Sequence, residues 1–196
     1  MEFQEVVTER RMVRAFRSRP VEQDKVRRVL ENALHAPSAG FTQGWGFLVL
    51  TGEAERARFW DAAWPSEERS GSRREAVMDA PLIIVCYSSK EAYLDRYAEP
   101  DKGWTDRDEG RWPAPFWDID AGFAALLMLL TAVDLGLGGL FYGLEHHESV
   151  AAEFGVPDDH RAIGALAIGY PAPDEPSPSL RRGRRPFEEV VHFGTW

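Results

Sequence analysis

Arginine is concentrated in two short segments near opposite ends of the chain. Residues 8–20 read TERRMVRAFRSRP and residues 179–191 read SLRRGRRPFEEVV, and together they contain nine arginines. A guanidinium group can bind a phosphate through two parallel, charge-assisted hydrogen bonds. Two interpretations are open at this point. The arginines bind a small anion, or they are solvated surface charges partly paired with Glu9, Glu188 and Glu189.

The overall charge limits the kind of partner that these arginines serve. The formal net charge is −9 and the pI is about 5.1, which argues against nucleic acid and against an anionic membrane surface, because both need a broad positive field. The first residues, MEFQEVVTERR, lack the apolar region of a secretory signal, so a cytoplasmic location is expected. Cys86 cannot form an internal disulfide and is expected to be a small buried side chain.

Apolar periodicity predicts alternating helices and strands in a single domain spanning residues 1–196. The amphipathic pattern over 22–35 predicts a helix that ends before Pro37. The order of elements predicts an α/β or α+β layered fold around a mixed sheet. The proline-rich segment 170–179 predicts an extended lead into a C-terminal arm. Strands are predicted at 46–51, 81–88, 138–144 and 162–169, and further helices at 53–64, 90–97 and 149–154.

Two segments stand out from this pattern. The composition of residues 99–117 predicts a long polar loop with three tryptophans. Three roles for these tryptophans remain open: a lid, a contact surface, or plain packing on the domain. Residues 118–136 predict a helix that is apolar on every face, with Asp118 and Asp120 interpreted as its caps. Its apolar run is too short to span a bilayer. A helix of this kind must be buried on every face, which predicts a subunit interface.

Three stretches in order resemble the FMN-dependent nitroreductase family. RRMVRAF is similar to the family's opening arginine motif, and APSAGFTQGW is similar to a helix end and loop that lie over the flavin of the partner subunit. LGLGGLFYG, followed by ALAIGYP and RRGRRPFEEVV, is similar to the family's ending. The resemblance implies a three-layer α+β fold, with a mixed central sheet flanked by helices, an extended C-terminal arm and an intertwined homodimer.

The resemblance also implies a set of FMN-binding residues. Arginines of the first and last motifs would hold the FMN phosphate and the pyrimidine edge, and Gly143 would offer its backbone N–H to flavin N5. Ser38 would contact the isoalloxazine of the partner subunit. No catalytic acid or base is implied, because the chemistry takes place on the cofactor. The full set is Arg10, Arg11, Met12, Arg14, Pro37, Ser38, Ala39, Gly40, Gln43, Tyr142, Gly143, Leu144, Arg182 and Arg184.

The implied activity is hydride transfer from NADH or NADPH through FMN to a small, flat aromatic acceptor, such as a nitroaromatic or a quinone, by a ping-pong mechanism. Phe41 stands where the family often has Asn, and Gly44 where it often has Pro, which puts the acceptor in question. Two alternatives remain open: flavin fragmentation of the 5,6-dimethylbenzimidazole synthase type, and flavin sequestration with the tryptophan-rich loop as a lid. His146 and His147 are adjacent and are expected at the surface, so no metal site is predicted.

Overall fold

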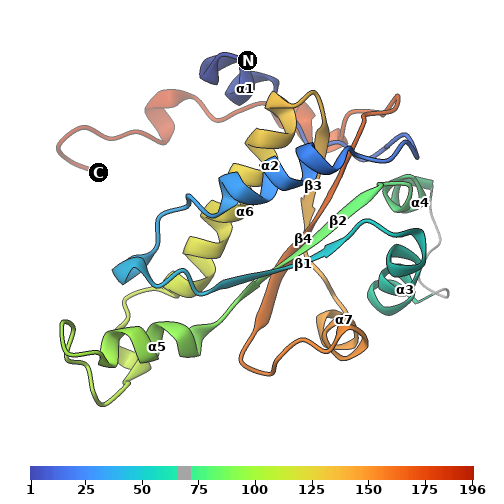
Figure 1. Cartoon of the computed structure of the whole chain (residues 1–196). Coiled ribbons are helices and arrows are strands. Elements are labelled where there is room, and N and C mark those ends of the chain that lie inside the picture. Colours follow the sequence, from blue (N-terminus) through green and yellow to red (C-terminus); the bar gives the residue numbers. More distant parts are fainter. Residues whose placement is uncertain (66–71) are drawn as a thin grey trace.

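The computed structural model of the chain, which describes residues 1–65 and 72–196, is an α+β fold built around a four-stranded sheet (Figure 1). The strands lie in the order β1-β2-β4-β3, and each neighbouring pair is antiparallel. The strands are β1 (Trp45–Leu50), β2 (Leu82–Ser88), β3 (Gly138–Tyr142) and β4 (Arg161–Gly169). The helices are α1 (Phe3–Glu9), α2 (Gln23–Ala33), α3 (Glu53–Ala63), α4 (Ser72–Met78), α5 (Lys90–Ala98), α6 (Phe116–Asp134) and α7 (His147–Phe154).

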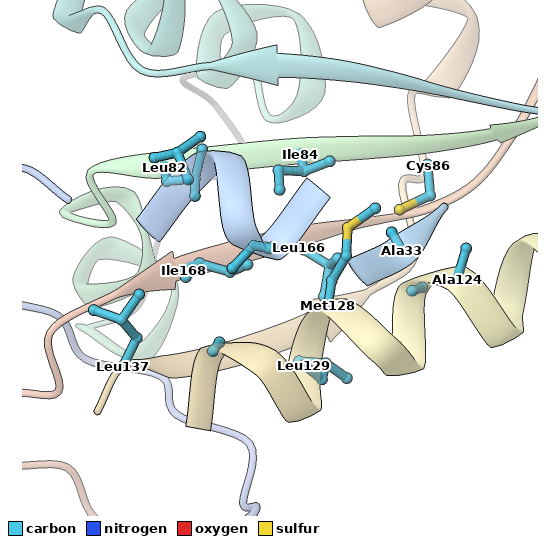
Figure 2. Close-up of a cluster of buried hydrophobic side chains, with 14 of the residues drawn as sticks. Ala33, Leu82, Ile84, Cys86, Ala124, Met128, Leu129, Leu137, Leu166 and Ile168 are labelled. Atoms are coloured by element: carbon cyan, nitrogen blue, oxygen red, sulfur yellow. The ribbon is translucent and has the colours of Figure 1, made fainter. Parts of the chain in front are cut away.

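The expected three layers are present, and the alternation of side chains along the central strands explains them. Ile84 and Cys86 of β2 point to one face of the sheet, where they pack with α2 and α6, and Figure 2 shows Met128 of α6 among them. Ile83 and Val85 point to the opposite face, where they pack with α3, α4 and α7. Because side chains alternate along a strand, a strand that is apolar at every position needs helices on both faces.

The prediction of a mixed sheet needs correction. All four strands pair antiparallel, and the parallel contact is a single bridge between Met12 and Gly139 at the β3 edge. Two short helices, α1 and α4, were not predicted. In α1 the one buried residue is Val6, so this helix has too little apolar periodicity to be recognised from sequence.

Helix α6 begins two residues earlier than predicted, at Phe116, and forms the centre of one helical layer. It is long and apolar enough to cross a membrane by length and composition alone, yet more than half of its apolar window is buried inside the domain. One stripe remains exposed in the single chain, formed by Ile119, Phe123 and Leu126 at 36, 43 and 46% exposure. The helix that was predicted to form a subunit interface therefore does expose an apolar stripe that the single chain leaves uncovered.

The C-terminal arm leaves the domain after pairing with the N-terminal segment. Pro171 forms an antiparallel bridge with Phe16, and the amide of Ala172 donates to the carbonyl of Ala15 over 3.0 Å. Beyond this point the chain runs past α1 and away from the sheet (Figure 1). Large apolar side chains of the arm stay exposed, including Leu180, Phe187 and Phe193.

Candidate functional site

The N-terminal arginine segment is fixed along the edge of β3. The amide of Val13 donates to the carbonyl of Gly139 over 3.0 Å, next to the bridge between Met12 and Gly139. A Cβ at Gly138 would lie 2.6 Å from Cγ2 of Val13, so the segment can approach this closely because residue 138 has no side chain. The edge of the sheet thereby sets the position of the arginine motif.

Asp174 anchors the same segment from the start of the C-terminal arm. Its carboxylate accepts a hydrogen bond of 2.9 Å from the amide of Arg14 and lies 3.9 Å from the guanidinium of Arg11. The Asp174 side chain is only 9% exposed. The guanidinium of Arg14 donates to the carbonyl of Met12 over 3.3 Å, and no carboxylate in the described chain pairs with it. The Arg14 guanidinium therefore forms no ion pair within the described chain, although Glu145 lines the same cavity.

Arg14 lines a cavity of about 340 Å³ together with two other predicted residues, Tyr142 and Gly143. Gly143 is exposed, and no atom lies within 4 Å of the position where its Cβ would be. Leu144 is half-buried and packs into the core beside α7 rather than lining this cavity. The remaining lining residues are Trp64, Val77, Leu140, Phe141 and Glu145.

An aromatic stack supports one wall of this cavity. The ring of Tyr142 stacks on Trp60 and Trp64, with centroid distances of 6.2 and 6.1 Å. The Tyr142 hydroxyl is buried and has no hydrogen-bond partner among the described residues. Burial raises the pKa of Tyr142, so this side chain stays neutral at physiological pH. The wall is therefore flat and uncharged, and Arg14 supplies a positive charge at the same cavity.

The predicted loop 37–43 lies at the other end of the molecule, beyond the C-terminal end of α2 (Figure 1). Pro37 precedes a short 3₁₀ helix, Ala39–Phe41, and the Ser38 hydroxyl accepts a 3.0 Å hydrogen bond from the Gln43 amide. Gly40 packs against Tyr97, where a Cβ would lie 2.7 Å from the ring. None of these loop residues lines the Arg14 cavity of the same chain. They meet that cavity only if a second chain supplies them.

The structure explains why Gly44 occupies a position where the family often has proline. Gly44 is buried under Tyr93, and a Cβ at this position would lie 2.6 Å from the Tyr93 ring and 3.1 Å from Ala92. Any side chain would therefore displace α5. The departure from the family pattern reflects a tyrosine packed onto the loop rather than a change in the cofactor cavity.

The interpretation of Asp118 and Asp120 as helix caps is wrong. Helix α6 begins after Pro115, so both residues lie inside its first turns. Asp118 accepts a hydrogen bond from the Ser88 hydroxyl and forms an ion pair with Arg161. Asp120 is 3% exposed and accepts hydrogen bonds from the Ala39 amide and the Tyr93 hydroxyl. No feature of the sequence distinguishes this role of Asp120 from that of a helix cap.

The arginines of the C-terminal arm are exposed and separate from the Arg14 cavity. Arg182 and Arg184 line neither this cavity nor the one beside Arg11, and no carboxylate in the described chain pairs with either of them. Arg185, by contrast, pairs with Glu189. Arg10 is half-buried and likewise has no carboxylate partner in the described part of the chain. One chain thus presents three separate parts of the predicted site.

The tryptophan-rich loop packs on the domain. Trp112 is central, with its ring centroid 4.5 Å from Tyr97 and 5.6 Å from Trp104. Trp117 belongs to α6 and contacts Trp112 edge-on. Of the three possibilities left open by the sequence, packing accounts for these tryptophans in the single chain. The tryptophan cluster also packs against α5. On its other side, α5 contacts Gly40 of loop 37–43 and Gly44, which directly follows that loop.

Comparison with known proteins identifies the family. The protein-family model described as "Nitroreductase family" matches residues 7–170, which is most of the chain. The chain belongs to the nitroreductase family. The matched region begins just before the arginine motif and ends at Tyr170, at the start of the arm.

Individual relatives in the family are distant in sequence but cover nearly the whole chain. A protein named NADH dehydrogenase from Thermus thermophilus is 32% identical, over 93% of this chain and 91% of its own. A 5,6-dimethylbenzimidazole synthase from Rhodospirillum rubrum is 27% identical over 92% of this chain and 89% of its own. The fold is similar to that of a candidate nitroreductase from Exiguobacterium sibiricum, solved in complex with FMN, with a TM-score of 0.76, 21% identity, and 98% and 97% coverage.

The cavity of this nitroreductase-family chain has the chemical features that suit a flavin. A flavin ring is flat and aromatic, and its pyrimidine edge becomes negatively charged on reduction. The stacked Tyr142 and Trp64 offer a flat wall, Arg14 offers a positive charge that no ion pair of the described chain engages, and the open space at Gly143 leaves room for a ring edge. The described residues therefore fit FMN at this position.

Proposed function

We propose that this protein is a cytoplasmic, homodimeric FMN oxidoreductase that uses NADH or NADPH to reduce a small aromatic acceptor. The observation that carries the proposal is the cavity in which Arg14, Tyr142 and Gly143 meet at the β3 edge of a nitroreductase-family fold. FMN bound there would accept a hydride at N5 from the nicotinamide and pass the reducing equivalents on to the acceptor. The names of the relatives, NADH dehydrogenase among them, support a nicotinamide reductant.

The residues of this chain would bind and orient the cofactor. Arg14, held by Asp174 and by the carbonyl of Met12, would face the pyrimidine edge and favour its reduced, negatively charged form. Gly143 would present its backbone N–H to N5. Arg10, Arg182 and Arg184 have no carboxylate partners in the described chain, which leaves their charges available for the phosphate.

The second chain would complete the site. The exposed stripe on α6 and the apolar side chains of the C-terminal arm are surfaces that a partner would bury. In such a dimer, Ser38 and the rest of loop 37–43 from one chain would cover the flavin held at Arg14 of the other. This arrangement explains why a single chain contains the parts of the site at opposite ends.

Phe41 is the candidate determinant of acceptor choice. Its side chain is 76% exposed at the tip of the loop, so it would offer an apolar ring beside the flavin rather than a polar group. Stacked aromatic pairs contribute about 0.5–1.5 kcal/mol beyond their burial. A flat acceptor such as a quinone or a nitroaromatic would therefore be preferred to an aliphatic one.

Flavin fragmentation is a second candidate, because the Rhodospirillum rubrum relative is a 5,6-dimethylbenzimidazole synthase that matches over 92% of this chain. The reaction would consume reduced FMN and O₂ and release a benzimidazole. Flavin sequestration lacks comparable support, since the tryptophans that would form its lid pack on α5 and α6 of their own chain.

A spectrum of the purified protein tests the proposal. We expect flavin absorbance bands that co-purify with the protein or appear when FMN is added. In air with excess NADPH, a reductase keeps its flavin intact through many turnovers. Progressive, irreversible loss of the flavin bands with a benzimidazole product would replace the reductase assignment with fragmentation. A protein that binds no FMN would contradict both.

A further inference from the structure

The loop 37–43 adopts a backbone conformation that costs free energy. Gly40, Phe41 and Gln43 have φ values of 62°, 55° and 55°. Phe41 and Gln43 carry side chains, and such residues seldom adopt left-handed φ values unless their surroundings hold them there. At Phe41 the strain cannot be offset by burial of the ring, because this side chain is 76% exposed.

A buried carboxylate holds the start of this loop. One oxygen of Asp120, Oδ2, accepts a 2.8 Å hydrogen bond from the Ala39 amide and a second 2.8 Å hydrogen bond from the Tyr93 hydroxyl. Asp120 is 3% exposed and Tyr93 is fully buried, so water does not compete for either bond. Hydrogen bonds to a charged acceptor are about twice as strong as neutral ones.

The contacts around Asp120 connect the loop to two helices. Asp120 lies on α6 and Tyr93 on α5, so the carboxylate joins both helices to the backbone of the loop. Arg96 of α5 adds a 3.0 Å hydrogen bond to the Gly40 carbonyl. The loop is thus fixed at two consecutive residues, 39 and 40, directly before the exposed Phe41.

We propose that Asp120 is a positioning residue for the flavin site: it holds loop 37–43 in its strained form, with Phe41 presented to the flavin of the partner chain before any ligand binds. The inference rests on the proposed function, because it assigns the loop to that site. The part of the proposal that concerns the free protein, namely that Asp120 holds the loop, does not depend on the proposed function. Preorganising the loop lowers the entropy lost when FMN binds.

The test compares Asp120→Ala with Asp120→Asn in the full-length dimer. The alanine removes the acceptor for both hydrogen bonds, whereas the asparagine keeps one oxygen that can accept both. Thr131→Val is the matched control. Thr131 is another buried polar residue of α6, at 5% exposure, and its hydroxyl accepts from Asn32, away from the loop.

Hydrogen exchange in the FMN-free protein measures the loop directly. We expect amides of residues 39–43 to exchange at least about tenfold faster in Asp120→Ala, at a rate between wild type and Asp120→Ala in Asp120→Asn, and at the wild-type rate in Thr131→Val. Unchanged exchange in Asp120→Ala overturns the proposal. If that variant does not fold, Asp120→Asn decides in its place, because its neutral oxygen accepts weaker hydrogen bonds than a carboxylate: faster exchange of the Ala39 amide than in wild type supports the proposal, and wild-type exchange refutes it.

FMN titration tests the connection to the site. The dissociation constant for FMN should rise about tenfold or more in Asp120→Ala and recover in part in Asp120→Asn. It should stay unchanged in Thr131→Val, even if Thr131→Val and Asp120→Ala unfold at the same temperature. A loop that exchanges faster with unaltered FMN affinity would overturn the positioning role. If the wild-type protein binds no FMN, the proposed function fails, and the exchange measurement still decides whether Asp120 holds the loop.

Discussion

Replacement of Arg10 by alanine should weaken FMN binding without unfolding the protein. Arg10 is half-buried and no carboxylate in the described chain pairs with it, so its removal breaks no ion pair among the described residues. Loss of one charge-assisted hydrogen bond to a phosphate costs about 1.5–3 kcal/mol, which corresponds to a dissociation constant higher by about 10- to 100-fold. Arg184→Ala should have a similar effect, because that side chain is exposed and also lacks a carboxylate partner among the described residues.

Fluorescence titration with FMN measures both variants and their double mutant. If both guanidinium groups bind the same phosphate, their effects should be coupled by about 0.5 kcal/mol or more rather than add independently. Arg27→Ala is the control, since Arg27 forms an exposed ion pair with Glu31 on α2 that is worth little and lies outside the proposed site. Wild-type FMN affinity in both Arg10→Ala and Arg184→Ala would refute the phosphate assignment.

Three further predictions follow from the packing and the electrostatics. Leu126→Glu places a charge on the exposed α6 stripe and should turn a dimer into a flavin-free monomer by light scattering at low micromolar concentration; a wild-type monomer that binds flavin would contradict the interface. A hydrogen bond from the Tyr170 hydroxyl lowers the pKa of Glu22 to about 2, so its stabilising effect is complete above about pH 4.5 and is lost as the pH falls towards 2. Between pH 5 and pH 3, the free energy of unfolding measured with urea should therefore fall less for Glu22→Gln than for wild type. An equal fall in the two proteins would refute this. Burial raises the pKa of the Cys86 thiol to about 12, so a thiol reagent at pH 8 should label it only after unfolding, and rapid labelling of native protein would contradict the packing.

The arrangement of layers could be predicted from sequence because the strands carry an unambiguous pattern. Residues 82–88 are buried at every position, and an apolar run this short and rich in β-branched residues is typical of a strand covered on both faces. The direction of the strands could not be predicted in this way. It depends on how the connections cross the sheet, and the parallel contact expected from the family reduces here to the Met12–Gly139 bridge.

The candidate site was partly predictable, for a different reason. The resemblance assigned Arg14 and Gly143 to one flavin, and the two residues line one cavity because the arginine segment lies along β3. The role of Asp120 could not be predicted, because an acid near the start of a helix is usually a cap. Its partners, Ala39 and Tyr93, are remote in sequence and meet it only through the packing of α5 and the loop against α6.

The most direct test of the reductase assignment is anaerobic mixing of the FMN-loaded protein with NADH or NADPH while the flavin absorbance is recorded. We expect the flavin band to bleach with at least one of the two nicotinamides and to return when a quinone or nitroaromatic is added afterwards. Because the two substrates would use one pocket in turn, steady-state rates should give parallel double-reciprocal plots. A flavin that stays oxidised with both NADH and NADPH would contradict the proposed oxidoreductase activity.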